Sequence, residues 1–204
     1  CLLTIAFSLA TVFCTAKIYA SLKTIRQWNH LLVVPIYLII GLFDGAIFLM
    51  VLLTIIDGLQ FFQLNYFIIF LGAVAGLAKI LYWWSIDSSQ SQSSTSTATG
   101  LGSSNKSVSM LDAPTTSETF IMREMGFAIA RKHSRRLRLI TILTLSIIPI
   151  IIIFLMTQPI ALVSPMVLGI IAILFSYFGT IIERWLFFAE AKHVAMLYYG
   201  ASKV

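Results

Sequence analysis

The stretch LLVVPIYLIIGLFDGAIFLMVLLTII, residues 31–56, carries a single charged side chain, that of Asp44. A helix needs about 20 mostly apolar residues to cross the hydrocarbon core of a bilayer. Four further apolar runs approach or exceed that length, and they cover residues 1–21, 64–86, 139–157 and 160–182. The sequence therefore predicts an all-α, polytopic membrane helix bundle with about five transmembrane helices.

The composition excludes the soluble classes of protein. Apolar residues make up 59% of the chain and charged residues 11%, and the mean hydropathy is +0.95. A soluble domain carries about 25% charged residues. Cys1 and Cys14 lie too far apart on one helix for a disulfide, so we expect them to be small buried side chains. The chain opens with Cys1 inside an apolar run, which we interpret as the absence of an N-terminal part.

Residues 88–118 divide the chain into two membrane parts. About half of them are Ser or Thr, which predicts a flexible linker. Residues 1–87 then contain three transmembrane helices, and residues 119–204 contain a basic amphipathic helix followed by two more. Thr115 and Glu118 have the spacing of a capping box at the start of that amphipathic helix. It is either an interfacial helix or the first turns of the fourth span.

The basic residues gather on one side of the predicted bundle. Five spans place the 21–30 loop, the 86–138 segment and the C-terminal tail on one face, and the 57–63 and 157–160 turns on the other. All 14 Lys and Arg residues belong to the first face or lie in a span within a few turns of it, which predicts that this face is cytoplasmic. Membrane topology thus accounts for the net charge of +6, and we expect no nucleic-acid partner. A second interpretation is that part of the charge docks a partner protein, through Arg131, Lys132, Arg135 and Arg136.

Charged residues inside the spans are functional hypotheses by default, because charge is costly at bilayer depth. Asp44 lies near the midplane, and it either pairs with Lys79, stays protonated or serves a function. Lys17 and Lys79 lie near predicted helix ends, where their ammonium groups are expected to reach the interface.

Three local patterns predict how the helices pack and end. Gly72-x-x-x-Gly76 predicts a close helix approach. Pro149, near the middle of the fourth span, predicts a kink that releases a backbone carbonyl near Leu145. An interfacial aromatic belt is predicted at the end of the third span, from Tyr82, Trp83 and Trp84.

No metal or haem site is predicted. Glu190 and His193 have the spacing of one half of a di-iron helix motif, but a di-iron bundle needs a second such motif and two more carboxylates. His30 and His133 lie in polar segments, away from the depth at which a transmembrane haem is ligated. The sequence also lacks a glycine-rich phosphate loop, a Cys/His metal cluster and a nucleophile elbow.

Three segments carry a resemblance to a known family. They are CTAKIYASLKTIRQW (14–28), MREMGFAIARKHSRRLR (122–138) and ERWLFFAEAKHVAMLYYG (183–200). They resemble the membrane anchor subunit of dimethyl sulfoxide reductase, one of the quinol-oxidising anchors of molybdopterin oxidoreductases. The resemblance implies that these five helices are the last five of eight in a multi-pass protein of the bacterial inner membrane.

The resemblance also implies an activity and partners. The family oxidises menaquinol without haem and passes electrons to an iron–sulfur subunit, which feeds a molybdopterin catalytic subunit. Some of its members hold these subunits on the side opposite the cytoplasm, so the docking side stays open. The chain would not be an enzyme on its own but the quinol-oxidising anchor of a complex.

Quinol oxidation needs an apolar slot, hydrogen-bond partners for two oxygens and an acceptor for two protons. Aromatic and ionisable side chains at one depth near the basic face fit that need, and an ordinary interfacial belt is the alternative. The predicted quinol-site residues are Tyr19, Arg26, Trp28, Arg184, Trp185, Glu190 and His193, with Phe188 as a further wall. His193 would accept a proton near neutral pH. The other functions considered are a solute or ion transporter subunit, with Asp44 and Lys79 on the pathway, and a purely structural anchor.

Overall fold

The computed structural model describes residues 2–57, 62–89, 94–101, 108, 111–112, 128–158 and 164–197. Every regular element in these ranges is a helix, which confirms the all-α prediction. The long helices are α1 (Leu2–Ala20), α2 (Val33–Asp57), α3 (Phe62–Ser88) and α9 (Pro165–Ala189). The remaining elements are α4 (Thr95–Thr99), α6 (Ala128–Lys132), α7 (Ser134–Ile142), η1 (Leu143–Ile147), α8 (Ile148–Met156) and η2 (Val194–Leu197).

Five helical segments are long and apolar enough to cross a bilayer, as the sequence predicts. Four of them are α1, α2, α3 and α9, and the fifth is the continuous run of α7, η1 and α8, which covers Ser134–Met156. The chain is therefore a multi-pass membrane protein.

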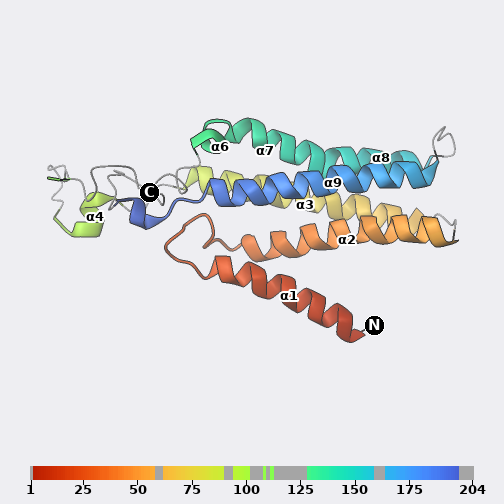
Figure 1. Cartoon of the computed structure of the whole chain (residues 1–204), viewed down its shortest axis with the longest axis horizontal. Coiled ribbons are helices and arrows are strands. Elements are labelled where there is room, and N and C mark those ends of the chain that lie inside the picture. Colours follow the sequence, from red (N-terminus) through yellow and green to blue (C-terminus); the bar gives the residue numbers. More distant parts are fainter. Residues whose placement is uncertain are drawn as a thin grey trace.

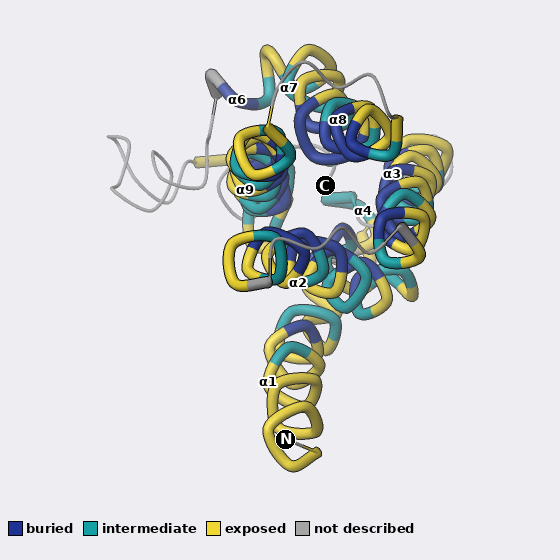
Figure 2. Tube along the Cα trace, turned by 90° about the vertical axis from the view of Figure 1, so that its right-hand side faces the viewer, coloured by how far each residue is buried: buried dark blue, intermediate teal, exposed yellow. Residues whose placement is uncertain are grey.

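Four of the spans form the bundle, and α1 lies outside it. Seen end-on, α2, α3, α8 and α9 surround a common centre, while α1 leans away from α2 (Figures 1 and 2). Ala16 is the one residue of α1 that is buried. The core inside the four-helix ring is built from large apolar side chains, among them Phe43, Ile47, Ile68 and Ile153, all fully buried.

The fourth span contains a π-helical turn just before Pro149. Proline has no N–H to donate and displaces the carbonyl one turn earlier, and a π-turn is one way for a helix to absorb that defect. Here η1 takes up the irregularity, and the hydroxyl of Ser146 donates a hydrogen bond of 2.7 Å to the carbonyl oxygen of Gly72 on α3. The π-turn includes Leu145, and the kink and the released carbonyl expected there stay predictions.

Small residues bring the helices close together at this level. A Cβ atom added at Gly76 would lie 2.7 Å from Ser146 Oγ, and one at Gly72 would lie 2.8 Å from the ring of Phe43. The Gly72-x-x-x-Gly76 pattern therefore serves close packing, as predicted. Gly179 on α9 performs the same role and was not predicted, since a Cβ there would overlap the backbone of Leu145.

Two predictions about exposure are wrong. Of the predicted belt residues, only Trp84 faces outward, at 69% exposed; Tyr82 and Trp83 are 3% and 6% exposed, because they pack into the bundle. Cys14 is exposed rather than buried, because α1 packs along so little of its length. Cys1 lies outside the described residues.

The basic segment before the fourth span is described only from Ala128. Thr115, Glu118 and most of the predicted amphipathic helix lie outside the described residues, and the division at 88–118 remains a prediction. From Ser134 the chain runs without a break into η1 and α8. Arg135, Arg136 and Arg138 therefore belong to the first turns of the fourth span, which was one of the two alternatives.

Candidate functional site

The 21–30 loop folds across one end of the bundle and is hydrogen-bonded to both α3 and α9. The hydroxyl of Tyr82 on α3 donates to the carbonyl oxygen of Gln27 at 2.8 Å, and the indole N–H of Trp28 donates to the carbonyl oxygen of Phe187 on α9 at 2.9 Å. The tail after α9 is held as well, because Ile25 forms an isolated β-bridge with His193. Two clusters of side chains, one aromatic and one polar, are assembled around this loop.

The aromatic cluster consists of five rings from α1, the loop, α2 and α9. Its members are Tyr19, Trp28, Tyr37, Phe187 and Phe188. The Tyr19 ring lies 5.2 Å from Trp28 in an edge-to-face contact, and Trp28 stacks on Phe187 at 5.6 Å. Such contacts favour a fixed geometry over simple apolar filling. The structure thus brings together the predicted Tyr19, Trp28 and Phe188, and adds Tyr37 and Phe187, which the sequence reasoning missed.

Arg184 lies at the edge of this aromatic cluster. Its guanidinium carbon is 3.8 Å from the centroid of Tyr37 and 5.2 Å from that of Phe187. Its Nε donates to the carboxylate of Glu183. The Nη1 atom is buried and forms no well-aligned hydrogen bond among the described residues, although the Tyr37 hydroxyl interacts with the guanidinium group. A buried donor of this kind is costly unless something accepts its hydrogen bond, so Arg184 is the side chain best placed to hold an oxygen atom of a bound molecule.

Glu183 joins Arg184 to a second cation inside the bundle. Its carboxylate forms an ion pair with Lys79 of α3, and the side chains of Lys79 and Glu183 are 1% and 0% exposed. The Lys79 ammonium also lies 4.3 Å from the centroid of Tyr82 and 4.9 Å from that of Trp83. The prediction that Lys79 reaches the membrane interface is therefore wrong, because a carboxylate and two aromatic faces hold it in the interior.

Asp44 does not pair with Lys79. Its carboxylate accepts hydrogen bonds from two hydroxyl groups of α9, those of Ser176 and of Thr180, the latter at 2.8 Å. No ion pair of Asp44 is found among the described residues. The rotation of α2 and α9 brings Asp44 opposite these hydroxyls, while Lys79 on α3 faces Glu183.

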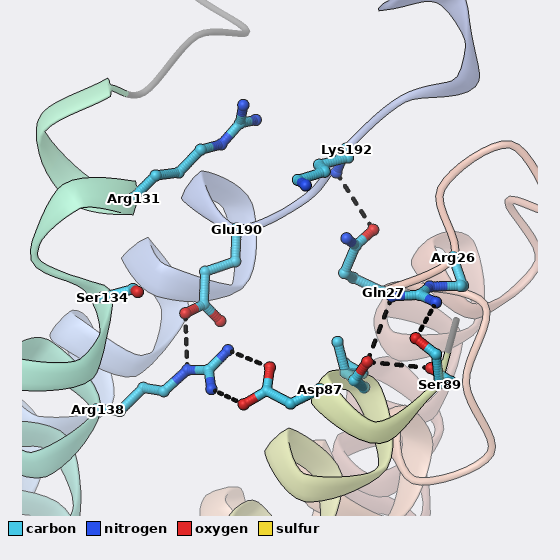
Figure 3. A pocket seen from close by; sticks show the side chains of 10 residues that line it. Arg26, Gln27, Asp87, Ser89, Arg131, Ser134, Arg138, Glu190 and Lys192 are labelled. Atoms are coloured by element: carbon cyan, nitrogen blue, oxygen red, sulfur yellow. Dashed lines mark hydrogen bonds and ion pairs between the residues drawn. The ribbon is translucent and has the colours of Figure 1, made fainter. Parts of the chain in front are cut away.

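The polar cluster lines a cavity of about 420 Å³ at the ends of α3, α7 and α9 (Figure 3). Arg138 occupies its floor, donating to both carboxylate oxygens of Asp87 at 2.5 and 3.2 Å and to Glu190 at 2.8 Å. Arg26 donates to the carbonyl oxygens of Ser89 and Ile86 at 2.8 and 3.3 Å. We call this space the polar pocket; its lining residues are Arg26, Gln27, Ile86, Asp87, Ser89, Arg131, Ser134, Arg138, Glu190 and Lys192.

The predicted docking residues differ in their surroundings. Arg131 donates to the carbonyl oxygens of Ala189 and Ala191 at 3.1 and 2.9 Å, so it closes the C-terminal end of α9. Burial lowers the pKa of Arg131 from its ordinary value. Lys132, Arg135 and Arg136 are exposed.

One curated protein is similar to most of this chain. That relative is a subunit of a redox enzyme. The chain is 32% identical over 193 residues to a sulfite dehydrogenase subunit from Allochromatium vinosum. The aligned region covers 94% of this chain but 57% of that protein, so the chain spans little more than half of its relative. No family model and no solved structure matches. With the five spans, this similarity supports a membrane subunit of an oxidoreductase complex, without singling out the dimethyl sulfoxide reductase anchor.

The predicted quinol-site residues are divided between the two clusters. Tyr19, Trp28 and Arg184 meet in the aromatic cluster, whereas Arg26 and Glu190 line the polar pocket. Two others join neither. Trp185 is 42% exposed on the outer side of α9, and the ring of His193 accepts a hydrogen bond of 2.9 Å from the N–H of Ala195 in the tail. Among the described residues, no group of three His, Cys, Asp or Glu side chains is arranged to hold a metal ion.

Proposed function

We propose that this chain is the membrane subunit of an oxidoreductase complex and exchanges electrons with the quinone pool beside Arg184. In the finer form of the proposal, the pool molecule is menaquinol, an iron–sulfur subunit docks on the basic face and a molybdopterin subunit performs the terminal chemistry. The orientation that goes with it is a bacterial inner membrane with the basic face in the cytoplasm. The similarity to a sulfite dehydrogenase subunit supports the coarse part of this proposal.

The observation that carries the site is the Arg184 guanidinium at the edge of five aromatic rings, where its buried Nη1 atom forms no well-aligned hydrogen bond to the described residues. A quinone head group is a flat ring with an oxygen at each end. Aromatic faces bind such a ring, and a guanidinium N–H binds its oxygen. The cluster belongs to the end of α1, the 21–30 loop, the start of α2 and the end of α9, which lie at the end of the bundle nearest α6 (Figure 1). The basic residues of α6 and of the first turns of α7 belong to the same end, so electrons would leave close to a docked partner.

The two-electron oxidation of a quinol releases two protons, which need acceptors on the same face. Glu190 and His193 remain the proposed acceptors. Glu190 is held by Arg138 in the polar pocket, and His193 lies in the tail that follows α9. We add Tyr37 to the proposed site as a positioning residue, and the contact of its ring with the guanidinium of Arg184 supports this role.

Substitution of Arg184 tests the site. Arg184→Leu removes the donor, and the loss of a hydrogen bond to a charged group predicts a fall of about ten- to a hundredfold in quinone-linked activity. Arg184→Lys keeps a cation beside Glu183 but loses the planar donor, so it should assemble normally and remain impaired. Trp185→Leu, on the outward side of the same turn, is the matched control and should retain activity.

The readout is electron transfer per assembled complex, measured with a quinol and with a soluble artificial donor. Activity with the soluble donor should be the same in all variants, because it bypasses the membrane site. Full quinone-linked activity in both Arg184 variants would show that the quinone does not bind beside Arg184.

Three exposed cations provide a test of docking. Reversal of Lys132, Arg135 and Arg136 to Glu should release the partner subunit from membranes, whereas each single exposed charge is worth only about 0–1 kcal/mol. Arg131 is left unchanged because it holds the end of α9. Retention of the partner by the triple variant would leave these residues as a topology signal only.

The direction of electron flow has two candidates. A dehydrogenase withdraws electrons from its substrate, so the similarity to a sulfite dehydrogenase subunit favours delivery of electrons to a quinone. The resemblance to the dimethyl sulfoxide reductase anchor favours the reverse. Membranes that contain the complex should show either sulfite-dependent quinone reduction or menaquinol-dependent reduction of dimethyl sulfoxide. The transporter alternative gains no support, because Asp44 and Lys79 bind different partners.

A further inference from the structure

Two cations share the carboxylate of Glu183 inside the bundle. The Lys79 ammonium of α3 contacts the Oε1 atom, and the Nε–H of Arg184 donates to the Oε2 atom. Each carboxylate oxygen therefore has a cationic partner of its own, one from α3 and one from α9. Because the side chains of Lys79 and Glu183 are buried, bulk water does not compete for this carboxylate.

A guanidinium and a carboxylate reach their strongest pairing in a different geometry. They form a fork of two parallel N–H···O bonds, one to each carboxylate oxygen. Lys79 opposes this fork because it occupies one of the two oxygens. The guanidinium of Arg184 lies instead on the face of Tyr37, 3.8 Å from the ring centroid, and its buried Nη1 atom forms no well-aligned hydrogen bond to the described residues. In that position it can donate to an oxygen atom of a bound ring.

Lys79 is itself held in place by aromatic side chains. Its ammonium lies 4.3 Å from the centroid of Tyr82 and 4.9 Å from that of Trp83, and the attraction of a cation to such faces adds to the ion pair. The hydroxyl of Tyr82 donates to the carbonyl oxygen of Gln27 at 2.8 Å, which joins this wall to the 21–30 loop. The ammonium is therefore fixed from two sides, and it can fix the carboxylate that it contacts.

We propose that Lys79 is a positioning residue of the quinone site. By holding Oε1 of Glu183, it prevents the guanidinium of Arg184 from turning onto that carboxylate and leaves N–H groups for a quinone oxygen. This inference rests on the proposed function, because it requires a quinone beside Arg184. Lys79 itself touches neither the ring nor the reacting atoms. A side chain of α3 thus sets the binding geometry of a side chain on α9.

Lys79→Met tests the inference in membranes that contain the assembled complex. The variant frees one oxygen of Glu183, so the guanidinium can form the fork and lose its position. We expect the KM for a naphthoquinol, or for the naphthoquinone if electrons flow toward the pool, to rise about five- to tenfold. The kcat per assembled complex should be unchanged, which is the pattern of lost substrate binding. The double variant Lys79→Met, Glu183→Gln removes the competing carboxylate as well, and its KM should return close to the wild-type value.

Gly179→Ala is the matched control, because it strains α9 against Leu145 rather than at the charged residues. It should lower the amount of assembled complex and leave the KM unchanged. A wild-type KM in Lys79→Met, or a raised KM that the double variant does not restore, would overturn the proposal. An equal rise of the KM in Gly179→Ala would assign the effect to bundle stability. If Arg184→Leu is impaired and Lys79→Met is not, only the role of Lys79 is wrong; full activity in Arg184→Leu would contradict the quinone site itself.

Discussion

Lys79 and Glu183 pair with each other in the interior of the bundle, with both side chains at most 1% exposed. The pair is not symmetric, because Glu183 has a second cation in Arg184, while the described residues offer Lys79 no second carboxylate. An uncompensated charge is expensive in this setting, and a pair that has lost one partner is worse than no pair at all. The order of stability among variants follows from that asymmetry.

Glu183→Leu should be the most damaging single change at this pair. It leaves the Lys79 ammonium buried without a carboxylate, and the expected loss is about 3–5 kcal/mol in the free energy of unfolding. Lys79→Met should cost less, since Arg184 still neutralises Glu183. The double variant Lys79→Met, Glu183→Leu should be more stable than Glu183→Leu alone. Thermal unfolding of the purified chain in detergent measures all three, and a double variant as unstable as Glu183→Leu would contradict the account.

Gly179 and Gly41 form a matched pair of helical glycines. A Cβ at Gly179 would overlap the backbone of Leu145 at the π-turn, whereas one at Gly41 would meet no atom within 4 Å. Gly179→Ala should therefore destabilise the chain by about 1–3 kcal/mol, the usual cost of overpacking. Gly41→Ala should be neutral or stabilising by up to about 1 kcal/mol, because alanine is the better helix former. The measurement is the thermal midpoint of each variant, compared with that of the wild type. A shift of equal size and sign in both variants would contradict the close contact at Gly179.

The number of spans could be predicted because a bilayer sets a minimum length for each apolar run. The rotation of each helix about its own axis could not be predicted. In α2 and α3 apolar residues surround the helix, so the sequence does not mark the inward face. Tyr82 and Trp84 show the consequence: two residues apart in α3, one is buried and the other exposed. Pairing of Asp44 with Lys79, one of the alternatives left open, is wrong for the same reason, because pairing depends on helix rotation and not on depth alone.

The candidate site was predictable in depth but not in arrangement. The sequence places Tyr19, Trp28 and Arg184 near one end of the bundle, and the structure brings them together. Trp185 follows Arg184 directly, so it is rotated by about 100° around the helix and is 42% exposed. Tyr37 was missed although it lies one turn inside α2, at the same end of the bundle as the end of α1. The depth that Tyr37 shares with the end of α1 was the one feature of the sequence that could have indicated it.

His30 should make the stability of the 21–30 loop depend on pH. Its ring lies between Ser85 Oγ, 3.0 Å from Nε2, and the N–H of Leu32, which donates to Nδ1 at 3.2 Å. Burial lowers the pKa of His30 below its ordinary value of 6.5. The unfolded chain therefore takes up the proton first as pH falls. The contribution of His30 is complete above about 6.5 and is lost as pH decreases through the folded-state pKa.

The measurement is the thermal midpoint at pH 7.5 and pH 5 for the wild type and for His30→Gln, whose side chain does not titrate. The wild type should lose more stability than the variant between these two pH values. Equal losses would mean that His30 makes no contribution to the pH dependence.

Asp44 offers a test of whether a buried carboxylate in the middle of the bundle is structural. Asp44→Leu leaves the hydroxyls of Ser176 and Thr180 without their acceptor, and we expect a loss of about 1–3 kcal/mol. Asp44→Asn retains one acceptor oxygen and should lose less. Thr180→Val removes one of the two bonds while leaving the carboxylate in place, with an expected cost of about 0.6–1.7 kcal/mol. If Asp44 only joins α2 to α9, quinone-linked activity per assembled complex is the same in Asp44→Asn as in the wild type. A fall in that activity without loss of assembly would show that the carboxylate takes part in proton or ion transfer.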